Sequence, residues 1–578
     1  MNITVFLKEV DKISSGFTKE QLADALHEIA RRLDETERRD FLKRLKGTEK
    51  AESGKIHAEI IRKHKSLKEQ LEKIKSCELT LQGELNQEYD EWYSSDDEEF
   101  IYSDPDGVLD ILEEAGDFLH QCVDSEEYEA GYDIARHLVG LEIMVDGEYQ
   151  EYTEEPVRID ELSYYKLGNL DYRRLVIDGV HAAYCASGLS DRSDAVYTML
   201  EMSKENDITM ETVMQSGWEL PESQEFLRLW AGYLAKKKSA RAEKMLGEAL
   251  ELVGDEELIL EKARSYCQEH PGLYEQYILG AMGRKDSREL LAVGREALEA
   301  VDRSYVARGR IALLTSRLAL EQGLGQEAEA CWLEAFRSDT RVVNYMRLAV
   351  ESEDFSQLKE AAKSIYQDMY VQIERNPCGA VRKGELTENC PGRITVCMLA
   401  FLGGDFEYVR DRAMNEKGAV GWSMTFMKCG LAAFLLLLFE GENLNQGCAY
   451  MCGKVVEDTG FSSKDYEQGI LGAVDDSSRE WFWKCFCRWK KMISITEEEK
   501  LEYLKWAGRL VARRVEGIMD GNHRNYYGEC AAYVAALGEV KESRGEVNGK
   551  QKALLEYKGL YSRRSAFHRE LRAMGMKG

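Results

Sequence analysis

Proline is scarce in this chain of 578 residues, which contains only six. None lies in the 187 residues that follow Pro391. Proline interrupts helix interiors, so long stretches without it permit helix after helix. Runs that alternate β-branched and polar residues are also scarce, which argues against an all-β fold. We therefore expect a mostly helical chain.

The chain also lacks a hydrophobic run long enough to cross a bilayer. Its most apolar stretch, residues 431–439, has nine residues, whereas a transmembrane helix needs about 20. The first residues show no basic start followed by an apolar core, so no signal peptide is predicted. The 14 cysteines are scattered, which is typical of reduced thiols rather than of a disulfide framework. We expect a cytoplasmic protein without a membrane contact.

Complete motifs for catalysis, cofactors and metals are missing as well. Residues 323–328 resemble a dinucleotide-binding turn but follow a predicted helix, whereas that turn requires a preceding strand. The cysteine pairs at 448/452 and 485/487 have no second pair in register, so no zinc site is predicted. We predict no cofactor, no metal and no enzyme activity. An active site assembled from distant residues stays an alternative, because its members need to meet only in space.

Charge is unevenly distributed along the chain, whose formal net charge is −28. Between Glu78 and Glu155, 26 acidic residues stand against a single base, Arg136, a balance of −25. From Leu501 to Gly578, 15 basic residues stand against nine acidic ones, a balance of +6. The acidic segment would steer basic partners, whereas the C-terminal end has the opposite preference.

A short phrase recurs in the middle of the chain, as Glu-Ala-Leu at 248–250 and 296–298 and Glu-Ala-Phe at 334–336. Each copy lies near the end of an amphipathic helix that follows another helix. A repeated helix hairpin cannot bury its apolar face alone, so neighbouring hairpins must stack. The intervals of 48 and 38 residues differ from the 34 of a strict tetratricopeptide repeat. The predicted fold class is all-α, a degenerate tetratricopeptide-like helical-repeat solenoid with an N-terminal helical, coiled-coil-like unit.

Five segments are predicted along the chain. Residues 1–90 form the N-terminal helical unit, and residues 91–107 form an acidic, aromatic linker. Residues 108–375 form a first helical-repeat block. A loop rich in proline and glycine at 376–393 separates it from a second block, 394–578, which has a basic end.

Within the N-terminal unit, residues 55–89 follow a heptad pattern that predicts one long helix. The seam consists of Ile60, His64, Leu67, Leu71, Ile74, Glu78, Leu81 and Leu85. This seam can pack on helices of the same chain or pair with a second copy, forming a dimer through residues 59–89. Packing within the chain is favoured, because four heptads make a short coiled coil.

The last 80 residues contain a recognisable order of motifs. They are Arg513-Arg514-Val515, His523-Arg524, Tyr526-Tyr527, Ala531-Ala532, Arg563-Arg564, Phe567 and Glu570-Leu571. This order resembles the helical region that accompanies SWIM-type zinc fingers in bacterial proteins. The finger itself is absent, because Cys485-Phe-Cys487 has no Cys-x-His after it. The resemblance implies a bacterial protein whose relatives bind zinc and nucleic acid.

Two sets of residues are candidate partner-binding sites. The acidic, aromatic set comprises Trp92, Tyr93, Asp96, Asp97, Glu98 and Glu99. The basic set comprises Arg513, Arg514, Arg524, Arg563, Arg564 and Arg569. We predict a non-enzymatic scaffold or adaptor that binds other proteins in the bacterial cytosol. The alternative is a nucleic-acid-associated regulatory or defence-complex subunit whose basic helices contact phosphates.

Overall fold

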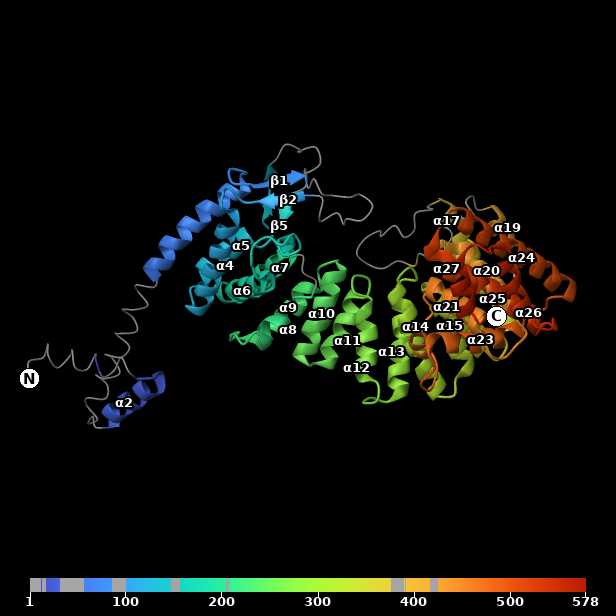
Figure 1. Ribbon diagram of the computed structural model, residues 1–578. Helices are drawn as coiled ribbons and strands as arrows, with labels where there is room; N and C mark the ends of the chain where they lie inside the picture. Colours follow the sequence, from blue (N-terminus) through green and yellow to red (C-terminus); the bar gives the residue numbers. More distant parts are fainter. Residues whose placement is uncertain are drawn as a thin grey trace, which may run out of the picture. The chain divides into compact units, whose positions relative to one another are not determined.

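A computed structural model describes residues 12, 17–31, 57–85, 100–146, 156–203, 207–375, 389, 391–415 and 425–577 (Figure 1). These residues belong to two compact units, Met1–Tyr233 and Leu234–Gly578. Most of them are helical, and consecutive helices pack as pairs, which confirms the predicted all-α, helical-repeat fold class. No helix within the described ranges has the length and apolar character that crossing a bilayer requires.

The first unit combines helix pairs with two small sheets. Its helices are α2 (Lys19–Arg31), a helix over 57–75, α4 (Val108–Asp124), α5 (Tyr128–Leu138), α6 (Tyr172–Ala186), α7 (Arg192–Ser203), α8 (Met210–Gln215) and most of α9 (Ser223–Leu234). In one sheet, β1 (Leu81–Leu85) pairs antiparallel with β2 (Phe100–Ser103) and parallel with β4 (Val145–Asp146). In the other sheet, β3 (Glu142–Ile143) pairs antiparallel with β5 (Val157–Arg158).

The long helix predicted over residues 55–89 ends early, and that expectation was wrong. Cys77 has a φ of 62°, in the left-handed region. The amides of Cys77 and Glu78 donate to the carbonyls of Ile74 and Lys73 at 3.0 and 2.9 Å. This is the Schellman arrangement that closes helices. Leu81 then enters β1, where pairing with distant strands buries it completely.

The remaining seam of the 57–75 helix packs inside the first unit. Ile60, Leu67, Leu71 and Ile74 are at most 1% exposed. These four residues are apolar positions of the predicted heptad pattern. The seam therefore packs on helices of the same chain, which is the alternative that the sequence favoured. The seam is therefore not exposed for the dimer suggested through residues 59–89.

Ion pairs across the same interface join the basic 57–75 helix to the acidic α4–α5 pair. Asp133 of α5 accepts hydrogen bonds from Lys68 at 2.6 Å and His64 at 2.9 Å. Lys63 lies 3.3 Å from Glu114 of α4. These acidic side chains thus have basic partners within the first unit, which runs across the predicted linker at 91–107.

We expect Asp133→Asn to loosen the 57–75 helix. Burial alone would raise the pKa of Asp133, but hydrogen bonds from Lys68 and His64 hold it below its ordinary value. A carboxylate with a lowered pKa stabilises the fold above its unfolded-state pKa, and that contribution is lost as the pH falls through the folded-state value. Asp133→Asn should therefore destabilise the first unit by about 1 kcal/mol near pH 7, with a smaller difference from wild type in acid.

Thermal unfolding of the full chain between pH 3 and 7 measures this effect, and Asp110→Asn is the matched control. Asp110 is an exposed carboxylate on the adjacent helix α4. A pH-independent loss of stability in Asp133→Asn would contradict the electrostatic explanation.

The second unit begins with a row of helix pairs, visible as adjacent ribbons in Figure 1. These helices are α10 (Ala240–Val253), α11 (Glu256–Tyr266), α12 (Gly272–Ala281), α13 (Ser287–Ala300), α14 (Val306–Glu321), α15 (Gly325–Ser338), α16 (Val342–Glu351) and α17 (Phe355–Arg375). Helix α12 contacts α10 and α14, and α15 contacts α17, so the pairs form two layers. Side chains of Ser239 and Asp255 accept backbone hydrogen bonds at the starts of α10 and α11, as N-caps do.

Ion pairs between successive repeats join residues at a nearly constant separation in the sequence. Arg264 binds Glu296, and Arg295 binds Glu327, each across 32 residues. Arg310 binds Glu275 across 35 residues. This spacing is close to the 34 residues of a tetratricopeptide repeat. The recurring phrase was misleading because its first copy lies in α10 and its later copies lie in α13 and α15, which belong to the other layer.

The rest of the second unit is a helical bundle that packs on the end of this row. It contains α18 (Arg393–Leu402), α19 (Phe406–Asn415), α20 (Thr425–Leu438), α21 (Gln446–Thr459), α22 (Ser463–Glu467), α23 (Ser478–Lys490), α24 (Glu497–Asp520), α25 (Tyr527–Ser543), α26 (Gly549–Leu560) and α27 (Ser565–Ala573). Helix α16 contacts α18, α22 and α23. Residues 234–375 of the first predicted block and the second predicted block, 394–578, therefore belong to one compact unit, which begins after Tyr233.

Residues 461–470, which include α22, fasten the bundle to the repeats, and we call them the α22 plug. Arg347 of α16 is completely buried and donates to the carbonyls of Asp465 and Tyr466, the latter at 2.9 Å. Trp332 donates from Nε1 to the carbonyl of Gly469 at 2.7 Å. Burial lowers the pKa of Arg347 to about 10, so the guanidinium stays charged near pH 7. A buried cation is thus satisfied by peptide oxygens of the plug.

We expect Gly469→Ala to destabilise the second unit by about 1–3 kcal/mol through overpacking. A Cβ at this position would lie 2.9 Å from Cδ of Arg347 and from Cδ2 of Leu313. Gly453→Ala in α21 is the control, because its Cβ would meet nothing closer than Cδ of Arg479 at 4.0 Å. Urea unfolding followed by tryptophan fluorescence measures both variants, and equal stability of the two would contradict the packing described here.

Candidate functional site

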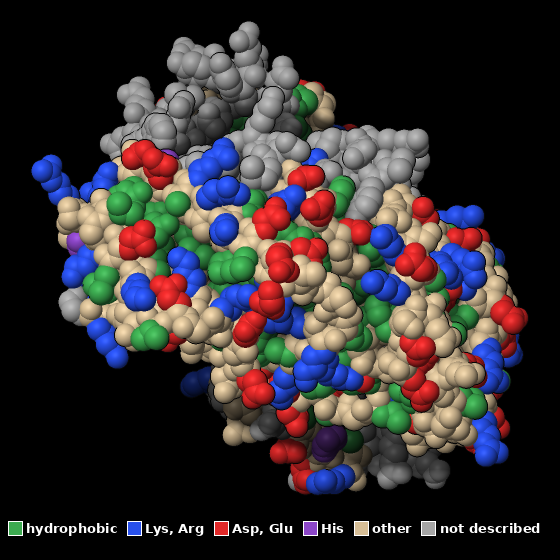
Figure 2. Space-filling view, turned by 90° about the vertical axis from the view of Figure 1, so that its right-hand side faces the viewer, with side chains coloured by type: hydrophobic (Ala, Val, Ile, Leu, Met, Phe, Trp, Pro, Cys, Tyr) green, Lys and Arg blue, Asp and Glu red, His purple; other side chains and the backbone are tan. Residues whose placement is uncertain are grey.

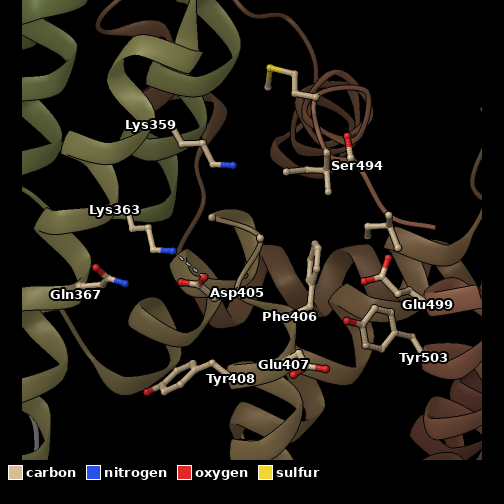
Figure 3. A pocket seen from close by; sticks show the side chains of 15 residues that line it. Lys359, Lys363, Gln367, Asp405, Phe406, Glu407, Tyr408, Ser494, Glu499 and Tyr503 are labelled. Atoms are coloured by element: carbon tan, nitrogen blue, oxygen red, sulfur yellow. Dashed lines mark hydrogen bonds and ion pairs between the residues drawn. The ribbon is translucent and has the colours of Figure 1, made fainter.

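A groove of about 730 Å³ lies in the second unit between α17 and α24 (Figure 3). We call it the α17–α24 groove. It is lined by Lys359, Lys363, Gln367, Gly403, Gly404, Asp405, Phe406, Glu407, Tyr408, Met492, Ile493, Ser494, Ile495, Glu499 and Tyr503. These residues come from α17, the α18–α19 turn, the α23–α24 connection and the start of α24, so the groove exists only once the bundle packs on the repeats.

The α18–α19 turn forms the floor of the groove and is held rigidly. The carbonyl of Leu402 accepts hydrogen bonds from Nε1 of Trp489 at 2.8 Å and from the hydroxyl of Tyr345 at 3.3 Å. A Cβ on Gly403 would lie 1.9 Å from the Tyr366 hydroxyl, so glycine is required for this close approach. The floor is therefore preformed rather than shaped by a ligand.

The α23–α24 connection forms an apolar rim. It lies between the end of α23 and a capping box at the start of α24, in which Thr496 and Glu499 bind each other's backbone amides at 2.8 and 3.2 Å. Hydrogen bonds from Thr496 hold the pKa of Glu499 below its ordinary value. Met492 is 46% exposed at this rim. The α23–α24 connection is thus fixed at both ends and exposes the large apolar side chain of Met492 to water.

The charges of the groove are unequally neutralised. Nζ of Lys363 lies 3.0 Å from Oδ1 of Asp405, and the carboxylate of Glu407 lies 3.4 Å from Arg410. In Figure 3, Lys359 projects into the open space one helical turn from Lys363. No residue within the described ranges forms an ion pair with Lys359. The groove therefore offers one uncompensated ammonium beside an apolar rim.

Two further cavities lie elsewhere in the chain. In the first unit, one of about 220 Å³ contains the buried Asp178, which binds Nδ1 of His120 at 3.0 Å. This histidine–carboxylate pair was missed from the sequence, because its members are 58 residues apart. In the second unit, one of about 560 Å³ lies beside the α22 plug, where Arg341 is neutralised by Asp339 at 2.6 Å and Asp465 at 2.7 Å. Within the described ranges, no group of three or more His, Cys, Asp or Glu side chains is placed to hold a metal ion.

The acidic, aromatic residues predicted as a partner site lie outside the described residues. They are Trp92, Tyr93, Asp96, Asp97, Glu98 and Glu99.

The six predicted arginines do not form one set. Arg513, Arg524, Arg563 and Arg569 are exposed.

Arg514 and Arg564 instead make contacts within the protein, and the burial of Arg514 corrects its assignment to a binding surface. Arg514 is 3% exposed, binds Glu529 at 3.1 Å and lies over the ring of Tyr526. Arg564 donates to Asn522 at 2.6 Å and to the carbonyl of Met519 at 2.7 Å. On the face shown in Figure 2, basic and acidic side chains are interspersed, and neither sign gathers into one patch.

Comparisons with known proteins add little to this description. No family model matches the chain, and no curated protein matches its sequence. Among solved structures, a circular tandem repeat protein with novel repeat topology and enhanced subunit contact surfaces is 13% identical. The match covers 81% of this chain and 91% of that chain, with a TM-score of 0.17. At this TM-score the likeness carries no argument, and the fold follows from the helix packing described above. The resemblance to the SWIM-associated region gains no support.

We expect Arg514→Ala and Arg513→Ala to behave differently although the residues are adjacent. Arg514→Ala removes the guanidinium that binds the carboxylate of Glu529, whose side chain is 11% exposed. Breaking a buried pair in this way costs about 3–5 kcal/mol. Arg513→Ala removes an exposed side chain and should change stability by less than about 0.5 kcal/mol. Chemical unfolding of both variants measures the contrast, and equal effects would contradict the structural role of Arg514.

Proposed function

We propose that this protein is a non-enzymatic helical-repeat scaffold or adaptor that binds a segment of another protein in the α17–α24 groove. The observation that carries the proposal is the groove itself, which combines a rigid floor, an exposed apolar rim and an uncompensated charge. Helical repeats stack into extended surfaces that bind partners. Preformed grooves with a few polar groups are suited to peptide segments, because the protein loses little entropy on binding.

The surface of the repeats is partly covered by the chain itself. At α14–α16 the α22 plug contacts Trp332, Ser316 and Arg347. The cavity beside the plug has its arginine paired twice. The proposed partner therefore binds at the junction of the repeats and the bundle.

We place the protein in the bacterial cytosol. The described cysteines form no disulfides, which agrees with a reducing compartment. The bacterial setting rests on the SWIM-associated resemblance of the last 80 residues.

Site-specific photo-crosslinking in the native cell tests the proposal. A photoreactive amino acid at Met492 should crosslink one defined protein, identified by mass spectrometry after nuclease treatment. The same group at Leu555 of α26 is the control, because Leu555 is 44% exposed and Met492 is 46% exposed. Equal crosslinking from both positions, or none from Met492, would overturn the groove as the partner site.

A nucleic-acid-associated role is the second candidate, and the exposure of Arg513, Arg524, Arg563 and Arg569 is the observation that favours it. Phosphate contacts make affinity fall steeply with salt. Fluorescence anisotropy with labelled single-stranded RNA between 50 and 200 mM salt should then show a strong salt dependence that weakens in Arg513→Glu/Arg563→Glu. An RNA affinity that changes neither with salt nor with these substitutions would contradict this candidate function.

A further inference from the structure

We infer that the α17–α24 groove selects an acidic, apolar peptide segment, with a carboxylate of the ligand at Lys359 and an apolar side chain on Met492. This inference rests on the proposed function and gives the chemistry of the partner. Its first support is the charge of Lys359. The groove's carboxylates already have partners, since Asp405 binds Lys363, Glu407 lies near Arg410, and Glu499 caps α24.

The position of Lys359 on α17 strengthens this support. Lys359 and Lys363 are four residues apart and therefore share one face of the helix, where like charges repel. Asp405 compensates only Lys363. A ligand carboxylate could pair with Lys359 as Asp405 pairs with Lys363 one turn further along α17. It would then reduce the repulsion between the two ammonium groups.

The apolar rim makes this carboxylate contact stronger than a surface ion pair. Met492 is 46% exposed, and it lies across the groove from α17 together with Ile493 and Ile495. Covering the exposed part of Met492 removes apolar surface from water, which stabilises a complex. A segment that covers the rim also excludes water from the groove, and an ion pair gains strength as the local dielectric constant falls. The two contacts therefore favour the same ligand.

Other ligand classes fit the groove less well. A basic peptide would place its cations against Lys359 and Lys363. A nucleic acid would bring a series of phosphates near Asp405, Glu407 and Glu499. A peptide segment with one carboxylate beside apolar side chains needs to place only that carboxylate at Lys359.

Selection from a phage-displayed library of random 12-residue peptides against the full-length protein tests the inference. We expect the selected peptides to be enriched in Asp or Glu next to Leu, Ile or Phe. Lys359→Glu should weaken their binding at least tenfold and shift a fresh selection towards basic, apolar peptides. Met492→Asp should abolish binding of both pools, because both use the apolar rim.

Lys505→Glu on α24 is the matched control, because Lys505 is exposed and does not line the groove. Its affinity for the selected peptides should stay within twofold of wild type, and circular dichroism should show that all variants are folded. Peptides that bind wild type and Lys359→Glu equally, but are lost in Met492→Asp, would overturn the acidic preference and leave the proposed function standing. Peptides that bind but ignore Met492→Asp, or a library that yields no binder, would overturn both.

Discussion

The burial of Arg347 is the constraint on which the rest of the second unit depends. A guanidinium without water must have its hydrogen bonds met inside the protein, and here the carbonyls of Asp465 and Tyr466 meet them. The α22 plug is therefore held on α14–α16, and α23 follows it against α16. Only because α23 ends there does its connection to α24 lie beside α17. The groove is thus a consequence of a charge buried elsewhere.

The same constraint changes how the repeats can be used. A stack of helix pairs without further cover would leave its surface open to partners. In this chain the α22 plug covers part of that surface at α14–α16. Polar groups there are already paired, as the double pairing of Arg341 shows. At the junction with the bundle, Lys359 has no ion-pair partner among the described residues, and the apolar side chain of Met492 is partly exposed. Both face the groove. Binding is proposed at that junction for this reason.

Helical character could be read from the sequence because it depends on local spacing. The scarcity of proline and the period of the apolar residues predicted the fold class, and the heptad positions Ile60, Leu67, Leu71 and Ile74 are buried as a seam. The prediction was wrong where contacts with residues far away in the sequence determine the secondary structure. Leu81 and Leu85 continue the heptad spacing, yet strand pairing with residues 100–103 and 145–146 takes them out of the helix. The recurring Glu-Ala phrase marked helix ends, but its first copy lies in a different layer from the later copies in α13 and α15.

What the sequence determined by itself is the type of structure, because helices and their caps depend on residues within a few positions of one another. Only the tertiary structure decided which charged side chains have partners within the protein and which are exposed to water. Arg513 and Arg514 are neighbours of the same type, but one faces water and the other is buried against Glu529. Trp332 and Gly469 meet across 137 residues, and the groove brings α17 and α24 together over a comparable separation. Such contacts follow from the packing of the whole unit, and no local pattern contains them.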